Sequence, residues 1–410
     1  HLMKAGYFNL YFLLLVLLLS FDSTAIGRSR PIASIPFKMS GTYIVVQTSI
    51  NGGPLLELIF DTGVRHTIIT ELYEEDSINI QLEKRQAIYG LGEGKSVYAL
   101  VSSNNELSLG KQQLHDKTIY VIEEDIFGLS AQNGRKINGL LGNAIMEHHV
   151  VEVNYTASRL RFYHSEGFTP PRNYISCPLL IENNKIYLTM TMLDEHGQTR
   201  TIKMLIDSGA QLNAWFKTNK GDHLPKNKVK ARIGEGFSGE IRGHLARIPR
   251  ICLEDYCFQN PIVAFPDSST ISEIYLNSDR DGTLGSELLA RFNYFIDMDK
   301  KMLYIKPNGN YKADFNYNIT GMEIIKSQYP FQQYEVMHLW DDSPAMKAGV
   351  QLNDVLLKIN DREIHRLSLS EVRGLFRRPS RTPLTLLIRR NNQVLELKVD
   401  MRDQLAIIDD

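Results

Sequence analysis

The chain carries one short pattern twice, and this repeat constrains its fold more than any other feature. Residues 42–60 alternate apolar and polar side chains, contain a glycine-rich turn, and end at the triplet Asp61-Thr62-Gly63. Residues 186–206 have the same character and end at Asp207-Ser208-Gly209. Alternation interrupted by turn residues predicts two strands and a hairpin turn before each triplet.

Two further landmarks follow each triplet in the same order. Gly92-Glu93-Gly94 corresponds to Gly234-Glu235-Gly236, and both read as hairpin tips. Asn138-Gly139-Leu140-Leu141-Gly142 corresponds to Asp281-Gly282-Thr283-Leu284-Gly285. The separations are 146 residues at the aspartates, 142 at the tips and 143 at the glycine elements. Three landmarks at nearly constant separation indicate an internal duplication.

Two Asp-Thr/Ser-Gly triplets, each followed by an apolar-Gly element, resemble the aspartic protease family. The short lobes are similar to its retroviral-type (retropepsin-like) branch, and their fusion resembles the single-chain, pseudo-dimeric members. The resemblance covers about residues 40–306. It implies a mainly β fold of two barrel lobes, at 40–165 and 175–308, with an active site between them.

The chemistry explains why one triplet is not enough. Two carboxyl groups about 3 Å apart cannot both ionise, so the pair holds one proton over a wide pH range. The ionised group can take a proton from water while the protonated group hydrogen-bonds the substrate carbonyl. We therefore interpret Asp61 and Asp207 as a catalytic dyad whose apparent pKa values belong to the pair.

The residues around the two aspartates are expected to support them. By resemblance, the hydroxyls of Thr62 and Ser208 lock the two loops together. Gly63 and Gly209 let the backbone turn tightly and approach the carboxylates. Residues 234–239 form either a second flap or a blunt loop. The candidate flap of the first lobe is a glycine-rich tip: Tyr89, Gly90, Leu91, Gly92 and Gly94.

The first triplet departs from the family pattern in the residues that follow it. Val64, Arg65 and His66 stand where small or hydroxyl residues are usual. An arginine beside a carboxylate lowers its pKa, so Arg65 bears on the pH optimum more than on the fold. Glu147-His148-His149 lacks a third ligand at suitable spacing and is interpreted as solvated surface. No metal and no cofactor are expected.

Residues 317–402 form a separate, α+β module. Residues 342–360 (DSPAMKAGVQLNDVLLKIN) combine a capped short helix, a glycine stop and a strand, and resemble a PDZ domain. Such domains bind an extended peptide as an added strand, often by its terminal carboxylate. The candidate carboxylate loop is Thr320, Gly321 and Met322; the module either docks or senses peptides or is a structural cap. Two arginine pairs are expected at its solvated edges: Arg377-Arg378 and Arg389-Arg390.

The amino-terminal segment predicts export. Met3 and Lys4 precede the apolar run 11–19 (YFLLLVLLL), and Ser23-Thr24-Ala25 follows it. A basic start, a short apolar run and a small-x-small end are typical of a secretory signal peptide, here residues 1–25. An uncleaved membrane anchor is the alternative. Either reading places the protein outside the cytoplasm, in a periplasm, in a cell envelope or secreted.

This location affects the three cysteines. Cys252 and Cys257 flank a plausible hairpin turn, and in an oxidising compartment they could form a disulfide. Two reduced structural thiols are the alternative. Cys177 has no evident partner and is expected to be buried.

Charge balance argues against a nucleic-acid partner, because the chain has 46 basic and 47 acidic residues and no basic stripe. No phosphate-binding loop or set of metal ligands is present in the sequence. We therefore expect an extracytoplasmic aspartic endopeptidase with a polypeptide substrate. A C-terminal peptide is the expected PDZ ligand, and the fused lobes predict a monomer. The alternative is a catalytically silent peptide-binding scaffold built from the same modules.

Overall fold

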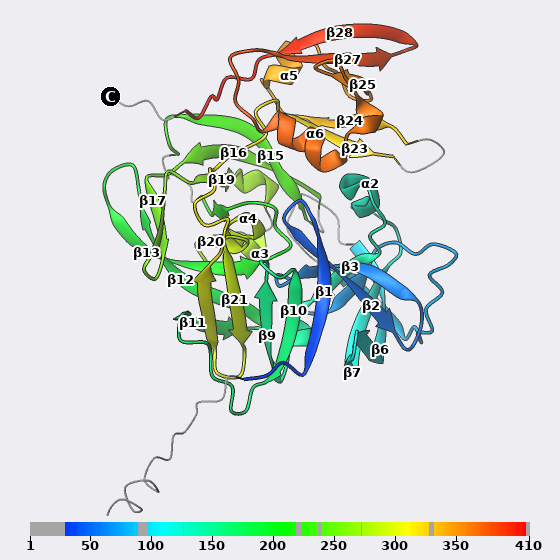
Figure 1. The fold of residues 1–410 in the computed structure, drawn as a ribbon, viewed down its shortest axis with the longest axis vertical. Coiled ribbons are helices and arrows are strands. Elements are labelled where there is room, and N and C mark those ends of the chain that lie inside the picture. The colour runs from blue at the N-terminus through cyan, green and yellow to red at the C-terminus, as the bar shows by residue number, and fades with distance from the viewer. Residues whose placement is uncertain are drawn as a thin grey trace, which may run out of the picture.

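The computed structural model describes residues 29–88, 97–125, 127–218, 224–236, 239–271, 273–327 and 332–406. Strands dominate this part of the chain, and its few helices are short (Figure 1). None of the helices described is long and apolar enough to cross a membrane. The predicted signal peptide and the first-lobe flap both lie outside the described residues.

We call residues 33–164 the first lobe and residues 175–307 the second lobe. The first lobe contains β1 (Ala33–Ser40), β2 (Tyr43–Ile50), β3 (Leu55–Asp61), β4 (Thr67–Ile69), β5 (Lys84–Ile88), β6 (Val97–Leu109), β7 (Gln112–Ile122), α2 (Leu129–Asn133), β8 (Gly139–Gly142), η1 (Asn143–Met146), β9 (His149–Asn154) and β10 (Arg159–His164). The second contains β11 (Ile175–Glu182), β12 (Lys185–Leu193), β13 (Thr199–Asp207), β14 (Ala214–Phe216), β15 (Lys228–Gly236), β16 (Gly239–Arg247), β17 (Arg250–Leu253), β18 (Tyr256–Gln259), β19 (Ile262–Pro266), η2 (Ser268–Thr270), α3 (Glu273–Leu276), β20 (Gly282–Gly285), α4 (Ser286–Leu289), β21 (Phe292–Asp297) and β22 (Met302–Pro307).

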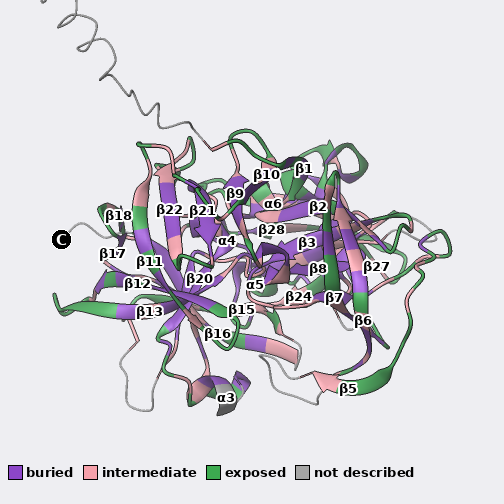
Figure 2. Cartoon of the chain, turned by 90° about the horizontal axis from the view of Figure 1, so that it is seen from below, coloured by how far each residue is buried: buried purple, intermediate pink, exposed green. Residues whose placement is uncertain are grey.

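An antiparallel sheet joins the two lobes at their base. Its strands follow the order β1, β10, β9, β21, β22, β11, so each lobe contributes three. The outer strands β1 and β11 alternate buried and exposed residues, whereas every residue of the central strand β21 is buried. Figure 2 shows this gradient: strands are buried where the lobes meet and exposed at outer segments such as β5 and the start of β13.

The strand pairings around the two triplets correspond. β3 runs parallel to β8 with Asp61 beside Gly142, and β13 runs parallel to β20 with Asp207 beside Gly285. The glycine elements need glycine because a side chain at these positions would collide with neighbouring backbone. A Cβ on Gly139 or Gly282 would overlap a carbonyl oxygen of β4 or β14. A Cβ on Gly142 or Gly285 would overlap a carbonyl oxygen of the loop after the triplet. Each aspartate is thus held at the end of a strand by one tightly packed neighbour.

The C-terminal module has its own sheet, in the order β23, β24, β25, β27, β28, with β23 at one edge. Its helix α6 begins at a capping box formed by Ser368 and Glu371. Its apolar core is continuous with part of the second lobe, because Trp215 and Leu245 belong to the same buried cluster as Met322. The elements are β23 (Met322–Lys326), β24 (Tyr334–Leu339), α5 (Pro344–Lys347), β25 (Val355–Ile359), β26 (Arg362–Glu363), η3 (Ile364–Arg366), α6 (Leu369–Phe376), β27 (Leu384–Arg390) and β28 (Gln393–Val399).

Candidate active site

The two triplets meet at the lobe interface through reciprocal hydrogen bonds. The Thr62 hydroxyl donates to the carbonyl of Ile206 (2.9 Å) and accepts from the Ser208 backbone N–H (3.0 Å). The Ser208 hydroxyl donates to the carbonyl of Phe60 (2.8 Å) and accepts from the Thr62 N–H (3.0 Å). These four bonds are buried, so water does not compete for them, and they fix the relative position of the two loops.

The glycine of each triplet makes room for the aspartate of the other lobe. A Cβ on Gly63 would lie 2.7 Å from the Asp207 carboxyl carbon, and a Cβ on Gly209 would overlap the Asp61 carboxylate. Each glycine N–H also donates to the aspartate of its own triplet, at 2.8 Å in the first lobe and 2.9 Å in the second. Neither glycine has a positive φ. The chain turns at each triplet as the sequence predicts, but this turn needs no positive φ, so the requirement for glycine comes from the close approach to the carboxylates.

The electrostatics of the two aspartates are unequal. Burial and the negative charge of Asp207 raise the pKa of Asp61 well above its usual range. Burial also raises the pKa of Asp207, and the N–H of each triplet's glycine opposes the rise at its own aspartate. At Asp207 the positive charges of Arg280 and Lys185 oppose it as well. The two positive charges therefore favour the ionised form of Asp207 when the pair holds one proton.

Arg65 does not act on the dyad as the sequence suggested. Its guanidinium pairs with Glu147 Oε1 at 3.1 Å, and Lys117 binds the other oxygen of that carboxylate at 3.0 Å. Glu147 is thus part of an ion-pair cluster at the lobe surface. The cations that influence the dyad are Arg280 and Lys185, which the sequence reasoning did not single out.

A cavity of about 1100 Å³ contains the dyad and is lined by both lobes and the C-terminal module. The hairpin of β15 and β16 lies along it with Gly234, Glu235 and Gly236, and its strands stay paired up to Gly236 and Gly239. Residues 237–238 at its tip, and the predicted first-lobe flap (Tyr89, Gly90, Leu91, Gly92 and Gly94), lie outside the described residues.

The C-terminal module forms one wall of this cavity. Ile324 on β23, His338 on β24 and Arg373 on α6 line the same space as the two aspartates. Glu323 on β23 binds Arg232 of the β15–β16 hairpin at 2.9 Å. The module therefore lies over the candidate active site. The sequence could not predict this, because the contacts join segments far apart in the chain.

The outer edge of β23 faces the first lobe. Helix α2 packs against β23, beside α6 (Figure 1). The Arg373 guanidinium donates to the carbonyls of Gln132, at the end of α2, and of Ile324, on β23. A Cβ on Gly134 would lie 3.2 Å from the Leu369 side chain of α6. The edge at which an added peptide strand would pair is therefore partly covered by the protein's own α2.

The predicted carboxylate loop is held by hydrogen bonds among its own residues. The Thr320 hydroxyl donates to Asn318 Oδ1 (2.7 Å) and accepts from the Met322 N–H (3.3 Å). The Gly321 N–H also donates to Asn318 (3.3 Å). These N–H groups are engaged within the loop. The role of the loop in holding a chain terminus stays a prediction.

Arg377 does not lie at a solvated edge as expected. It bridges α6 to the second lobe through an ion pair with Glu287 at 2.8 Å. Arg390 binds the buried carboxylate of Asp354 at 2.7 Å. Both ion pairs connect elements that are distant in sequence.

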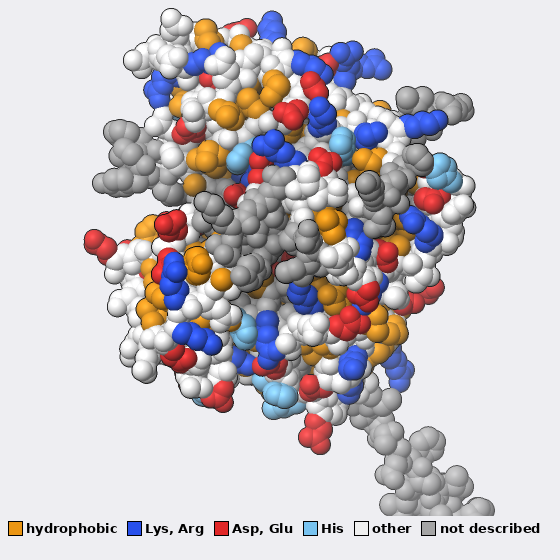
Figure 3. Space-filling model, turned by 180° about the vertical axis from the view of Figure 1, so that it is seen from behind, with side chains coloured by type: hydrophobic (Ala, Val, Ile, Leu, Met, Phe, Trp, Pro, Cys, Tyr) orange, Lys and Arg blue, Asp and Glu red, His pale blue; other side chains and the backbone are white. Residues whose placement is uncertain are grey.

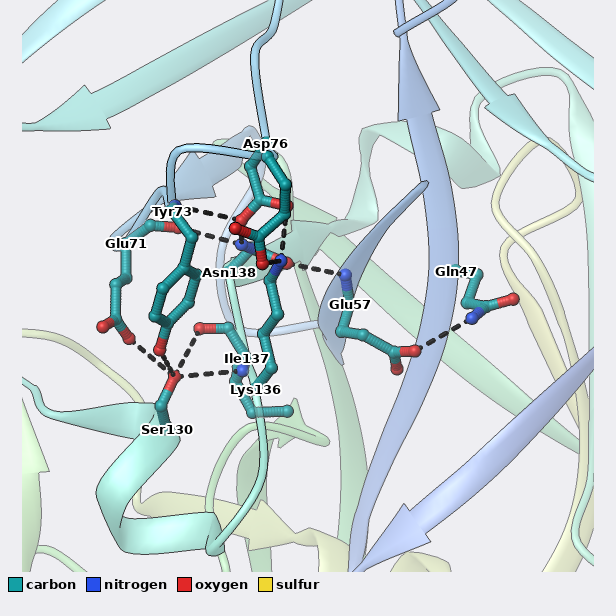
Figure 4. A network of polar contacts seen from close by, with 10 residues as sticks. Gln47, Glu57, Glu71, Tyr73, Asp76, Ser130, Lys136, Ile137 and Asn138 are labelled. Carbon is teal, nitrogen blue, oxygen red and sulfur yellow. Dashed lines mark hydrogen bonds and ion pairs between the residues drawn. The ribbon is translucent and has the colours of Figure 1, made fainter. Parts of the chain in front are cut away.

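A polar network links α2 to the first-lobe glycine element (Figure 4). The Asn138 side chain donates to Asp76 Oδ2 (2.7 Å) and accepts from the Glu57 N–H (3.0 Å). The Ser130 hydroxyl, on α2, donates to Glu71 Oε2 at 2.6 Å. Since Asn138 immediately precedes Gly139, the network ties the position of α2 to the strand that packs beside Asp61.

The structure joins Cys252 and Cys257 in a disulfide across the β17–β18 hairpin. Cys177 is a buried free thiol, and burial raises its pKa to about 12. No group of three or more potential metal ligands occurs in the described ranges.

Comparison with known families agrees with both modules. Residues 46–145 match the family described as aspartyl protease, and residues 341–390 match the PDZ domain family. No curated protein matches the chain. The protein thus combines an aspartyl-protease-type domain, retropepsin-like in character, with a C-terminal PDZ domain.

Proposed function

We propose that this protein is an extracytoplasmic aspartic endopeptidase whose catalytic dyad is Asp61 and Asp207. One observation carries the proposal: reciprocal hydrogen bonds lock the two triplets so that each glycine packs against the other lobe's aspartate. A turn or capping role for either aspartate gives no reason for this cross-lobe arrangement. The two lobes then act as a pseudo-dimer within one chain.

In this proposal the cations beside Asp207 support different roles for the two aspartates. Asp207, ionised beside Arg280 and Lys185, takes a proton from water as the water oxygen bonds to the substrate carbonyl carbon. Asp61 gives its proton to the carbonyl oxygen. The tetrahedral intermediate collapses as Asp207 passes its proton to the leaving nitrogen and the carbon–nitrogen bond breaks. Asp61 recovers its proton from the former carbonyl oxygen, so the dyad returns to its starting state.

The location outside the cytoplasm rests on two features. The segment 1–25 has the composition of an export signal, and the Cys252–Cys257 disulfide suits an oxidising compartment. Cleavage of the signal can be checked by sequencing the mature amino terminus after expression with the native leader.

The PDZ domain, in this proposal, controls access to the dyad. It lines the cavity, and α2 covers the strand edge that a docking peptide needs. A peptide that pairs with β23 must displace α2 and with it the contacts of Arg373. Peptide docking and opening of the cavity are therefore coupled.

Cleavage of a proteome-derived peptide library tests the proposed activity. Products are identified by mass spectrometry for the wild type and for Asp61→Asn, at several pH values. The proposal predicts new peptide ends with the wild type alone. If both folded proteins bind peptides and neither cuts them, the protein is a silent peptide-binding scaffold and the proposal is wrong.

A further inference from the structure

The two lobes carry very different side chains at one pair of equivalent positions, just before the glycine elements. Gly139 and Gly282 begin the equivalent strands β8 and β20, and the residues two positions earlier are Ile137 and Arg280. Ile137 is fully buried in an apolar cluster with Ile59 and Leu129. The second lobe places a guanidinium where the first lobe has an aliphatic side chain.

The cavity walls reflect this difference. On the first-lobe side the apolar residues packed around Ile137 line the cavity, while Arg65 and His66 also contribute to that side. The apolar residues are Tyr43, Ile59, Phe127, Leu129 and Leu140. On the second-lobe side Trp215 and Tyr275 stack at 4.9 Å between ring centroids, and the Arg280 guanidinium lies 4.1 Å from the Tyr275 centroid. This aromatic pair holds the guanidinium in place through cation–π contact.

Arg280 forms no ion pair that explains its burial, since Asp207, the acidic group whose charge acts on it, lies beyond ion-pair distance. It is 5% exposed, yet among the described residues no carboxylate lies within ion-pair distance of it, and its Nε makes no hydrogen bond. Buried guanidinium groups normally have a carboxylate partner, because desolvating an unpaired charge is costly. A buried guanidinium that lines a cavity and forms no ion pair therefore indicates an anionic ligand.

Two cations of this wall, Arg280 and Lys185, form no ion pair with a described carboxylate. Lys185 lines the same cavity, and Arg280 is among the charges that lower its pKa. The carboxylates of Glu182 and Asp279 are both bound by Lys203, each at 2.7 Å. Counting Lys203, three cations balance these two carboxylates and the single negative charge of the dyad. Arg280 and Lys185 are the two of the three that form no ion pair with a described carboxylate. On the outer face seen in Figure 3, by contrast, basic and acidic side chains are interspersed.

From this asymmetry we infer that the second-lobe side of the cavity binds a substrate carboxylate through Arg280, with Lys185 adding positive charge. The first-lobe side, around the apolar cluster of Ile137, takes an apolar side chain of the substrate. The substrate is then a polypeptide with an acidic residue on one side of the scissile bond and an apolar residue on the other. The inference rests on the proposed function and makes Arg280 a specificity-determining residue.

The carboxylate has two chemical sources, an internal Asp or Glu side chain and a peptide terminus. Three peptides separate them: an internal Glu with both ends blocked, the same peptide with Gln, and the Gln peptide with a free terminus placed beside the cleavage site. Preference for the blocked Glu peptide identifies a side chain. Preference for the free terminus alone assigns the pocket to chain ends.

The decisive measurement is the ratio of kcat/KM for the Glu and Gln peptides. We expect the wild type to favour Glu by about 10-fold or more, the range of one charge-assisted hydrogen bond. Arg280→Met should abolish the preference and Arg280→Lys should retain part of it. A ratio is used because any effect of Arg280 on Asp207 acts on both peptides equally. Arg200→Met, at an exposed position of β13, is the charge-matched control and should keep the wild-type ratio.

A binding assay separates failure of this inference from failure of the proposed function. Fluorescence anisotropy with Asp61→Asn, which leaves Arg280 and Lys185 intact, reports affinity without cleavage. Tighter binding of Glu over Gln that Arg280→Met removes supports the inference even if no peptide is cut. Cleavage with equal binding and equal kcat/KM for all three peptides overturns the inference and leaves the endopeptidase intact.

Discussion

The hydroxyls of Thr62 and Ser208 each accept a hydrogen bond from the backbone N–H of the other residue, at 3.0 Å in both directions. Each hydroxyl also donates to the carbonyl that precedes the other lobe's aspartate. The positions of Asp61 and Asp207 are therefore set by one closed set of bonds between the lobes. Without these four hydrogen bonds, nothing in the two loops would keep the carboxyl groups of Asp61 and Asp207 close together.

Thr62→Val should weaken both stability and activity. The substitution keeps the shape of the side chain but leaves the Ser208 N–H and the Ile206 carbonyl buried without a partner. We expect a loss of about 1–3 kcal/mol in the free energy of unfolding, measured by urea denaturation, and a fall in kcat/KM. Thr62→Ser retains the hydroxyl and is the control; equal stability of the valine variant and the wild type would show that the bonds do not hold the lobes.

Gly209→Ala should remove activity because its Cβ would overlap the Asp61 carboxylate. The dyad must separate to admit the methyl group, and geometry errors of about 1 Å cost about 100-fold in rate. Gly309→Ala is the matched control, since nothing lies within 4 Å of the point that its Cβ would occupy and its φ is not positive. Full activity of Gly209→Ala would contradict the close packing of the dyad.

Lys185→Met should shift the acidic limb of the pH–rate profile to higher pH. The positive charge of Lys185 opposes the burial-induced rise in the pKa of Asp207, so its removal raises that pKa. Since the mechanism needs ionised Asp207, activity is then lost at a higher pH as the solution is acidified. Lys111→Met, at an exposed first-lobe position, should leave the limb in place. An unchanged or downward-shifted limb for Lys185→Met would separate this lysine from the dyad.

Arg373→Met should loosen the PDZ domain from the first lobe. The substitution removes the donor that joins the carbonyls of Gln132 and Ile324. We expect faster hydrogen exchange in α2 and β23 and faster cleavage of folded protein substrates, because the cavity opens more often. Arg378→Met, at an exposed position just after the end of α6, is the control. Slower cleavage with unchanged exchange would show that the PDZ contact completes the site and does not restrict it.

Much of the site could be predicted from short sequence patterns, because each of these patterns reflects the conformation or packing of a single element. The strand before Asp61, the capped helix at Ser368 and the glycines at 139 and 142 each reflect backbone geometry or crowding within one element. Comparison of the two copies also contained a signal for Arg280, since it aligns with Ile137 two residues before equivalent glycines. A charge that replaces a core aliphatic residue in one copy marks a functional difference.

The remaining features depend on packing between distant segments. The ion pair of Arg377 with Glu287 and the position of α2 against β23 have no periodic or spacing signal. Arg65 was expected near the dyad because it is close in sequence, but the chain directs it to Glu147 instead.

The pH dependence of kcat/KM on a cleaved peptide tests the shared-proton dyad most directly. Wild type, Asp61→Asn and Asp207→Asn are compared from about pH 3 to about pH 8, with circular dichroism to confirm that all three fold. The account predicts a bell-shaped profile for the wild type, because one carboxyl must be ionised and the other protonated. Each single variant should lose about 100-fold or more in rate at every pH. Comparable cleavage by either variant, or a wild-type profile with only one limb, would contradict it.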